Sequence, residues 1–325
     1  MRKHRHTPRS TVQPLNLSHV RTYPLSSRHS KVNISDFAVS WKRGKNFRSF
    51  LDSLPDFLAV QSLRAVVRAI IRARERGKPV IFGMGGHPTK VGLNPILIDL
   101  IQRQIITAIA VNGAVIIHDF ELAYLGHTSE EVDTEIDSGR FGMAEETGKI
   151  LNKAICEGWE AKQGIGESVG RYITRHPKLF PHRRMSLLAT GVQVGIPVTV
   201  HVAMGADIIH MHPSADGAAI GGSSLIDFRL LASTVSRMEG GVYLNLGSAV
   251  MLPEVFLKTV TLSRNLGRAL KNITTVNMDF LHHYRPATNV VKRPTQKGGR
   301  GYTLIGHHEI MLPLLAAAII EQIGS

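Results

Sequence analysis

The chain has 325 residues, and 43% of them are hydrophobic, so it is long enough for one large domain or two smaller ones with a substantial core. Its one cysteine, Cys156, excludes an intrachain disulfide and is typical of a reducing compartment, so we expect a cytoplasmic protein. The longest late apolar run, residues 310–320, is too short to cross a bilayer, and we expect no membrane partner.

The basic charge is concentrated at the N-terminus. The formal net charge is +14, and residues 1–50 hold eleven lysines and arginines against Asp36 alone, which is ten of those fourteen charges. Residues 1–40 are also rich in Pro, Ser and His, so we predict a basic arm that is draped on the surface or disordered. It is Arg-rich and acid-poor like a transit peptide, but it lacks an amphipathic stripe. Because only 6% of the residues are aromatic, there is no stacking platform, and we expect no nucleic-acid partner.

Regular patterning begins near residue 56. Apolar residues from Leu63 to Ile71 recur at helical spacing, with arginines on the other side, and Gly77 and Pro79 end that helix. Short apolar runs then alternate with helical segments. The predicted strands are 79–84, 106–113, 195–202, 240–248, 273–278 and 301–306. The predicted helices between and after them are 93–104, 114–126, 145–163, 224–238, 249–260 and 309–323.

This alternation predicts an α/β protein. The strands are continuously apolar, as expected when helices cover both faces of a parallel sheet. The fold class is therefore a Rossmann-like, doubly wound, mostly parallel sheet with helices on both faces. No repeat or linker interrupts the pattern, so we predict one domain over residues 41–325.

Glycine and polar residues follow the predicted strands. In an open parallel sheet, ligands bind at the carboxyl ends of the strands, where glycines let the backbone approach phosphates and a carboxylate holds ribose hydroxyls. None of these loops has the GxGxxG spacing, but their repeated placement favours a dinucleotide. The residues concerned are Gly85, Gly86 and His87, then Asn112, Gly113, His118 and Asp119, then Asp216, Gly217, Gly247, Ser248 and Asp279.

Each of these features also has a purely structural interpretation. Gly85 and Gly86 are also typical of a tight turn, and a helical histidine such as His118 is more often a core imidazole than a catalyst. Asp119 lies near a helix start, where the helix dipole favours an acid. Neighbouring side chains diverge, so His307, His308 and Glu309 do not form one zinc site, and we expect no metal.

The motifs resemble those of the deoxyhypusine synthase family. The stretches that carry the resemblance are "NGAVIIHD", "PSADGAAIGGSS", "VYLNLGSAVMLPEVFLK", "YRPATNVVKRP" and "YTLIGHHEIMLPLLAA", in that order, within residues 40–322. The resemblance implies NAD as cofactor and a homotetramer with sites at subunit interfaces. It also implies transfer of an aminobutyl group from spermidine to an amine, through an imine on an active-site lysine.

The resemblance places the family's cofactor and catalytic residues on this chain. Gly85, Gly86 and His87 fall on its first NAD loop, and Asn112 and Gly113 on its second. His118 and Asp119 fall where an acidic group approaches nicotinamide or polyamine. Asp216 and Gly217 match a pair near the ribose, Gly247 and Ser248 a glycine-rich turn, and Asn277 and Asp279 the last cofactor strand end.

The chain departs from the family at the polyamine site. Leu252 and Pro253 stand where the family has a lysine and two histidines. Lys292 lies two residues before the expected imine-forming lysine, and Lys297 lies after it. Residues 280–300 contain no acid, so this segment is expected to repel spermidine.

The sequence therefore predicts an NAD-dependent, deoxyhypusine synthase-like enzyme. We expect it to transfer or oxidise an amine-bearing small molecule, with His118 and Asp119 in the catalytic site and Lys292 as nucleophile. The alternative is a non-catalytic, nucleotide-binding or regulatory relative of the family.

Overall fold

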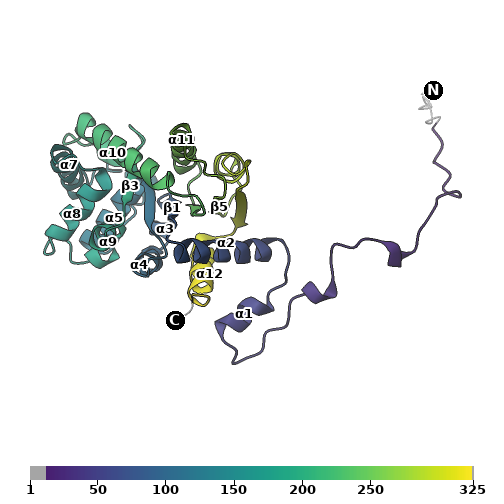
Figure 1. Cartoon of the computed structure of the whole chain (residues 1–325). Helices are drawn as coiled ribbons and strands as arrows, with labels where there is room; N and C mark the ends of the chain where they lie inside the picture. The colour runs from purple at the N-terminus through teal and green to yellow at the C-terminus, as the bar shows by residue number, and fades with distance from the viewer. Residues whose placement is uncertain (1–11, 324–325) are drawn as a thin grey trace, which may run out of the picture.

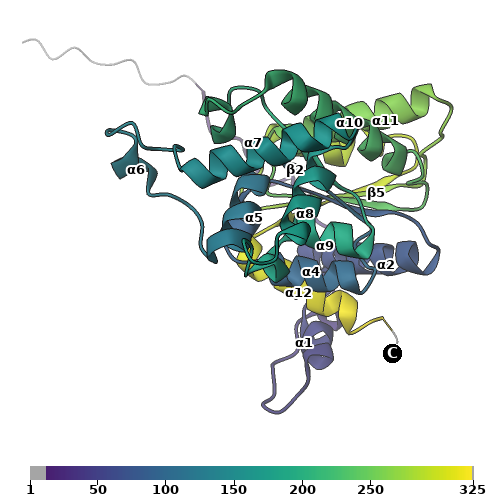
Figure 2. The ribbon, with the colours of Figure 1, turned by 90° about the vertical axis from the view of Figure 1, so that its left-hand side faces the viewer.

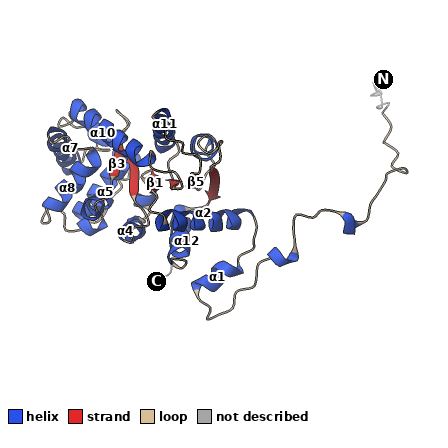
Figure 3. Ribbon diagram, viewed as in Figure 1, coloured by secondary structure: helices blue, strands red, loops and turns tan. Residues whose placement is uncertain are grey.

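The computed structural model describes residues 12–323. Six parallel strands form a single sheet in the order β3-β2-β1-β4-β5-β6, drawn in red in Figure 3. The order reverses between β1 and β4, which makes this pair the topological switch point of the sheet. The strands are β1 (Val80–Met84), β2 (Ala108–Asn112), β3 (Val198–His201), β4 (Val242–Leu246), β5 (Thr274–Asp279) and β6 (Arg300–Ile305).

Helices cover both faces of the sheet (Figure 1). In Figure 2, α10 and α11 lie on one side of the strands, and α2, α4 and α12 on the other. The helices are α1 (Phe47–Ser53), α2 (Leu58–Glu75), α3 (His87–Lys90), α4 (Asn94–Gln102), α5 (Gly113–Leu125), α6 (Val132–Glu135), α7 (Glu145–Glu160), α8 (Ile165–Arg175), α9 (Leu187–Val194), α10 (Gly217–Val235), α11 (Met251–Asn265), α12 (His308–Ile320), and the π-helix η5 (Pro286–Lys292).

Successive strand residues pack into two different cores, because their side chains alternate between the faces of the sheet. Phe82 and Met84 belong to the larger core, under α2, α4, α5 and α12, whereas Ile81 packs into the smaller one, under α10 and α11. The register places Ile81 between Ala108 of β2 and Tyr243 of β4. Both faces of β1 are therefore covered, as predicted from the continuous apolar run, whereas the edge strand β6 is mostly exposed.

The smaller core depends on a glycine in β1. The Tyr243 ring stacks on Phe256 of α11, with ring centroids 3.7 Å apart. A Cβ added to Gly83 would lie 2.0 Å from Tyr243 Oη, so any side chain at position 83 would displace this ring. Gly83 thus makes room for the largest fully buried side chain of the described residues.

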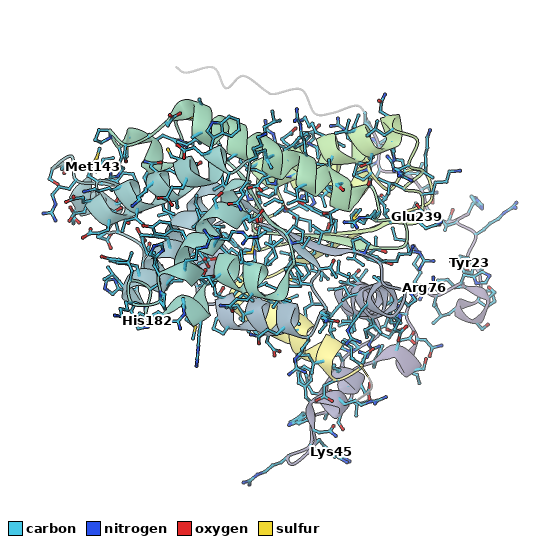
Figure 4. All side chains as sticks on the ribbon, turned by 60° about the vertical axis from the view of Figure 1, so that its left-hand side comes forward. Tyr23, Lys45, Arg76, Met143, His182 and Glu239 are labelled. Carbon is cyan, nitrogen blue, oxygen red and sulfur yellow. The ribbon has the colours of Figure 1, made fainter. Side chains whose placement is uncertain are left out.

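Residues 12–46 extend away from the body (Figure 1). In Figure 4, Tyr23 and Lys45 both project beyond the helices and strands. The arm is joined to the body near residue 56, where the Asp56 N–H donates to the Asp36 carbonyl at 2.8 Å and Arg64 pairs with the Asp56 carboxylate at 2.9 Å. Residues 1–11 of the predicted arm lie outside the described part of the chain.

The strands and the six predicted helices are confirmed, with shifted ends. Three short helices, α1, α3 and α6, were not predicted. Nor were α8 and α9, which lie in the long β2–β3 connection, or η5, which joins β5 to β6. Within residues 12–323, no helix has the length and apolar character needed to cross a bilayer.

Candidate functional site

The backbones of β1 and β4 approach each other closely at the switch point. The Gly85 N–H donates to the Leu246 carbonyl at 3.2 Å, and a Cβ added to Gly85 would lie 2.5 Å from the Gly247 carbonyl oxygen. Gly247 itself has a positive φ of 62°. Both glycines are therefore required by geometry: a Cβ at Gly247 would also lie 2.7 Å from the His308 ring. We call the segment of the carboxyl edge formed by Gly85, Gly86 and Gly247 the glycine crevice.

His118 faces this glycine loop. Asn112 caps the N-terminus of α5 by accepting from the Val115 N–H, and His118 follows on the second turn of the helix. A Cβ added to Gly86 would lie 3.4 Å from His118 Cδ2 and 3.7 Å from Nε2. The imidazole is thus brought to the loop that follows β1, in agreement with the predicted meeting of these two segments.

A hydrogen-bonded chain orients the His118 ring. His118 Nδ1 lies 2.8 Å from Thr128 Oγ1, and the Thr128 hydroxyl donates to Glu121. Since the one hydroxyl proton is used for Glu121, Thr128 accepts from His118, which assigns the proton to Nδ1. Nε2 then carries a lone pair on the side of Gly86. Thr147 also donates to Glu121, at 3.1 Å, and so holds the last member of this series of hydrogen bonds in place.

The environment keeps His118 neutral. Burial, assisted by the nearby positive charge of Lys90, lowers the pKa of His118 from 6.5 to about 4. Near neutral pH the imidazole is therefore a proton acceptor rather than a donor. Such a group has no proton on Nε2 to supply at the start of a reaction and can only accept one there, as a weak base.

Asp207, a residue that the sequence analysis did not single out, covers the start of α5. A Cβ added to Gly113 would lie 2.1 Å from Asp207 Oδ2, so only glycine fits beneath this carboxylate. Asp207 Oδ2 accepts from the Ala203 N–H at 3.2 Å, and burial raises the pKa of its carboxyl group.

Asp207 and His118 line the same cavity, which has a volume of about 230 Å³. The other lining residues are Lys90, Ala114, Ile117, Glu121, Ser129, Glu130, Val132, Phe141, Ala206 and Ile208.

Rings and a buried carboxylate gather at the ends of β5 and β6. The His87 ring centroid lies 5.2 Å from that of His308 and 5.4 Å from that of Phe280. Phe280 also stacks on His307, at 5.8 Å. Asp279 is 2% exposed, and its carboxylate lies 4.0 Å from His308 Nε2. Burial lowers the pKa of His308, against the opposing effect of Asp279.

Asn277 and Ser248 lie beneath the crevice and shape the β4 turn. Asn277 is fully buried and accepts from Asn245 Nδ2 at 2.8 Å, and the same Nδ2 donates to the Ser248 carbonyl. Ser248 Oγ accepts from the Leu252 N–H at 3.1 Å, which holds the start of α11.

The Asp119 carboxylate is used inside the core. It is fully buried and accepts from the Leu187 N–H at 2.7 Å, the Leu188 N–H at 3.3 Å, Ser186 Oγ and Asn94 Nδ2. Burial raises its pKa to about 6, although these donors act in the opposite direction. Asp119 thus joins α5 to the N-terminus of α9, and its neighbour His118 alone faces the crevice.

Replacing Asp119 by alanine is expected to lower the free energy of unfolding by about 3 kcal/mol, because four buried donors lose their acceptor. Urea unfolding followed by circular dichroism measures this loss. Asp99→Ala is the matched control, since Asp99 pairs with Arg103 on the surface of α4, and we expect a change within about 0.5 kcal/mol. Equal losses in the two variants would contradict the structural role of Asp119.

The contacts of Asp216 and Gly217 lie at the start of α10. Asp216 is exposed and caps this helix by accepting from the Ala218 and Ala219 N–H groups at 2.8 and 2.9 Å. A Cβ added to Gly217 would meet nothing within 4 Å. None of these contacts joins Asp216 or Gly217 to Gly85, Gly86 or His118.

Lys292 is the last residue of η5, Lys297 follows it, and both lysines are exposed. The chain around them runs toward the start of β6. The Arg264 guanidinium donates to the carbonyls of Pro294 and of Leu270, which precedes β5. The Arg300 N–H donates to the Ile273 carbonyl. These contacts are at the amino ends of β5 and β6. The glycine crevice lies at the opposite edge, so the structure does not bring the two lysines to it.

A second and larger cavity, of about 1010 Å³, lies at the amino edge of the sheet, between residues such as Lys78, Thr107, Pro197 and Glu239. Figure 4 shows Glu239 and Met143 on opposite sides of the body, and Met143 belongs to the segment that flanks the His118 cavity. Since ligands of open parallel sheets bind at the carboxyl edge, the smaller cavity is the candidate site.

Of the residues missed from the sequence, only Glu121 had a signal. It follows His118 by three positions, which places both side chains on one side of a helix. Thr128, Asp207 and Phe280 come from irregular segments, and no spacing in the sequence connects them with His118.

Comparison with solved structures places the fold among known proteins. A protein assigned to the LOR/SDH class from Methanococcus maripaludis S2 is 15% identical, with a TM-score of 0.51 over 82% of this chain and 71% of its own. AgrE in complex with ornithine and NAD+ is 16% identical, with a TM-score of 0.50 over 81% of this chain. A protein assigned as a deoxyhypusine synthase from Entamoeba histolytica is 13% identical, with a TM-score of 0.51 over 88% of this chain and 96% of its own.

These likenesses establish a shared Rossmann-like fold. The chain spans about a third of AgrE, since the match covers 33% of that protein. No family model matches the sequence, and no curated protein matches it.

Proposed function

We propose that this chain is an NAD-dependent enzyme that oxidises an amine-bearing small molecule at the carboxyl edge of its sheet. The observation that carries the proposal is the orientation of His118, whose Nε2 is held toward Gly86 by the chain of hydrogen bonds through Thr128 to Glu121. The resemblance to deoxyhypusine synthases and the NAD complex of AgrE support the choice of cofactor.

The crevice offers suitable residues for each part of a dinucleotide. Gly85, Gly86 and Gly247 would let the pyrophosphate approach the backbone at the switch point. Asp279 would hold ribose hydroxyls, and the Phe280 ring would stack on a base. His308 Nδ1 is buried and has no partner among the described residues, so the region still has a polar atom to satisfy.

In the proposed reaction, His118 acts as the general base. NAD, when bound, accepts a hydride from a substrate carbon. His118 Nε2 accepts the proton that the substrate nitrogen gives up, and Nδ1 keeps its bond to Thr128. Glu121, 4.0 Å from His118 Nδ1, stabilises the imidazolium that forms.

Aminobutyl transfer from spermidine is not part of the proposal. That chemistry needs an imine-forming lysine at the crevice, whereas Lys292 ends η5, Lys297 follows it, and the chain after them runs to the start of β6. The exposed position of Lys292 supports a second candidate, a nucleotide-binding or regulatory protein without turnover. Homotetramer formation and a cytoplasmic location stay predictions from the resemblance and from the single cysteine.

Isothermal titration of the full chain with NAD tests the proposal. We expect saturable binding, and about tenfold weaker binding for Asp279→Asn, because a charged hydrogen bond to the ribose is lost. Asp52→Asn is the matched control: Asp52 is exposed on α1, outside the proposed site, and NAD affinity should not change. Absence of binding to the wild-type chain, or equal losses in both variants, would contradict the assignment.

A further inference from the structure

Two charged groups on the walls of the His118 cavity have hydrogen-bonding capacity that the described part of the protein does not use. Within residues 12–323, Lys90 forms no ion pair, and Asp207 Oδ1 accepts no hydrogen bond. Lys90 ends the short helix α3 after the glycine loop, and Asp207 covers the start of α5. The two groups therefore approach the cavity from different elements, one positive and one negative.

The other acids that line the cavity are already used by the protein. Both carboxylate oxygens of Glu130 accept from the Gly142 N–H, at 3.1 and 3.2 Å. Those of Glu121 accept from Thr128 and Thr147. His118 is neutral, as argued above. Neutral N–H and O–H donors do not cancel the charge of Glu121 or Glu130, so the cavity wall carries three carboxylates and one lysine. Among the described residues, the charged groups of this wall without a hydrogen bond from the protein are the Lys90 ammonium and Asp207 Oδ1.

We propose that this cavity binds a small α-amino acid as its zwitterion, with the ligand carboxylate on Lys90 and the ligand ammonium on Asp207. The proposal deepens the function proposed above and rests on it, because it names the substrate class of the same site. A ligand with opposite charges on one carbon satisfies both groups at once, in the cavity that His118 also lines.

The cavity also restricts the size and charge of the ligand. Its volume of about 230 Å³ is below the range typical of sites for drug-sized molecules, so it suits a compact metabolite. A diamine would bring a second cation toward Lys90, and a dicarboxylate without an amine would bring an anion toward Asp207. Each like-charge contact is unfavourable in a partly buried site. Ala114, Ile117 and Val132 provide apolar walls for a short side chain.

The test is calorimetric titration of the NAD-saturated full chain with each proteinogenic L-amino acid, L-ornithine and L-norvaline. The best binder is then compared with its decarboxylated amine and its deaminated acid. We expect both analogues to bind at least tenfold more weakly. In Lys90→Gln, the advantage of the amino acid over its decarboxylated amine should fall to about threefold or less. In Asp207→Asn, the ratio of the affinity for the amino acid to the affinity for its deaminated acid should likewise fall to about threefold or less. Lys149→Gln, on the surface of α7, is the control and should change neither ratio.

The outcomes separate this inference from the proposed function. If NAD binds but no amino acid does, or if the decarboxylated amines bind as tightly as the amino acids, the inference is wrong and NAD binding stands. If the wild-type preference persists in Lys90→Gln, the assigned carboxylate partner is wrong. If NAD itself does not bind, the proposed function fails first, and the amino-acid titration of the chain without NAD then reports on the cavity alone.

Discussion

His118→Ala is expected to lower the rate of hydride transfer by about 10²–10⁴-fold, because a positioned general base contributes about this much. The affinity for NAD should stay within about twofold, since the crevice glycines and Asp279 are untouched. Stopped-flow absorbance of NADH in a single turnover measures the chemical step, and calorimetry measures the binding. The substrate is the amino acid that binds most tightly in the titration above.

His127→Ala is the matched control, because His127 is exposed and lies just before Thr128. It should leave the rate unchanged. Thr128→Val keeps the volume of the side chain but breaks the hydrogen bonds to His118 and Glu121, and we expect an intermediate loss. A full rate in His118→Ala would contradict the assigned base, and a full rate in Thr128→Val would contradict the role of the hydrogen-bonded chain.

The same assignment fixes the direction of the pH dependence. Burial lowers the pKa of His118 to about 4, and the neutral imidazole is the reactive form. The single-turnover rate should therefore hold as the pH falls from 7 to 5 and decline only near pH 4. A decline centred near the ordinary histidine value of about 6.5 would show that His118 is not desolvated in the working enzyme.

Gly85→Ala is expected to weaken NAD binding by at least about tenfold and to lower the free energy of unfolding by about 1–3 kcal/mol. The new Cβ would lie 2.5 Å from the Gly247 carbonyl oxygen, a backbone atom that cannot rotate away, and the two residues directly follow the adjacent strands β1 and β4. The strand ends must therefore move apart where the pyrophosphate would bind. Calorimetry and urea unfolding measure the two effects.

Gly221→Ala separates this contact from the general effect of adding a methyl group. Gly221 lies within α10, and a Cβ there would meet nothing within 4 Å. Since alanine favours a helix over glycine by about 1 kcal/mol, this variant should be as stable as the wild type or more stable, with unchanged NAD affinity. Normal NAD binding by Gly85→Ala would place the dinucleotide away from the switch point.

Periodicity was sufficient to predict the sheet. Six apolar runs became six parallel strands; β1 to β5 are buried almost throughout, whereas the edge strand β6 is mostly exposed. The helices α8 and α9 were missed because each is short and carries glycine, which has a low helix propensity. η5 begins with a proline and contains three β-branched residues, so propensity gave no sign of a helix there.

The candidate site was only partly predictable. Strand ends converge in any parallel sheet, so Gly85, Gly86 and His118 could be placed together from the sequence. Which of two adjacent residues, His118 or Asp119, faces the crevice depends on the contact of α5 with α9, and α9 was not predicted. Asp207 lies in the irregular loop after β3, and Lys292 is the last residue of the π-helix η5. The positions of both residues therefore depend on backbone that periodicity does not predict.

Hydrogen–deuterium exchange of the full chain with and without NAD tests the central claim most directly, because it reports where the ligand binds without presupposing a reaction. The account predicts slower exchange in residues 84–92, 112–118, 246–249 and 279–281, which carry the glycine crevice and its flanks. It predicts no change at residues 76–79, 236–240 and 267–270, at the amino edge of the sheet. Protection of the amino edge with none at the carboxyl edge would contradict it.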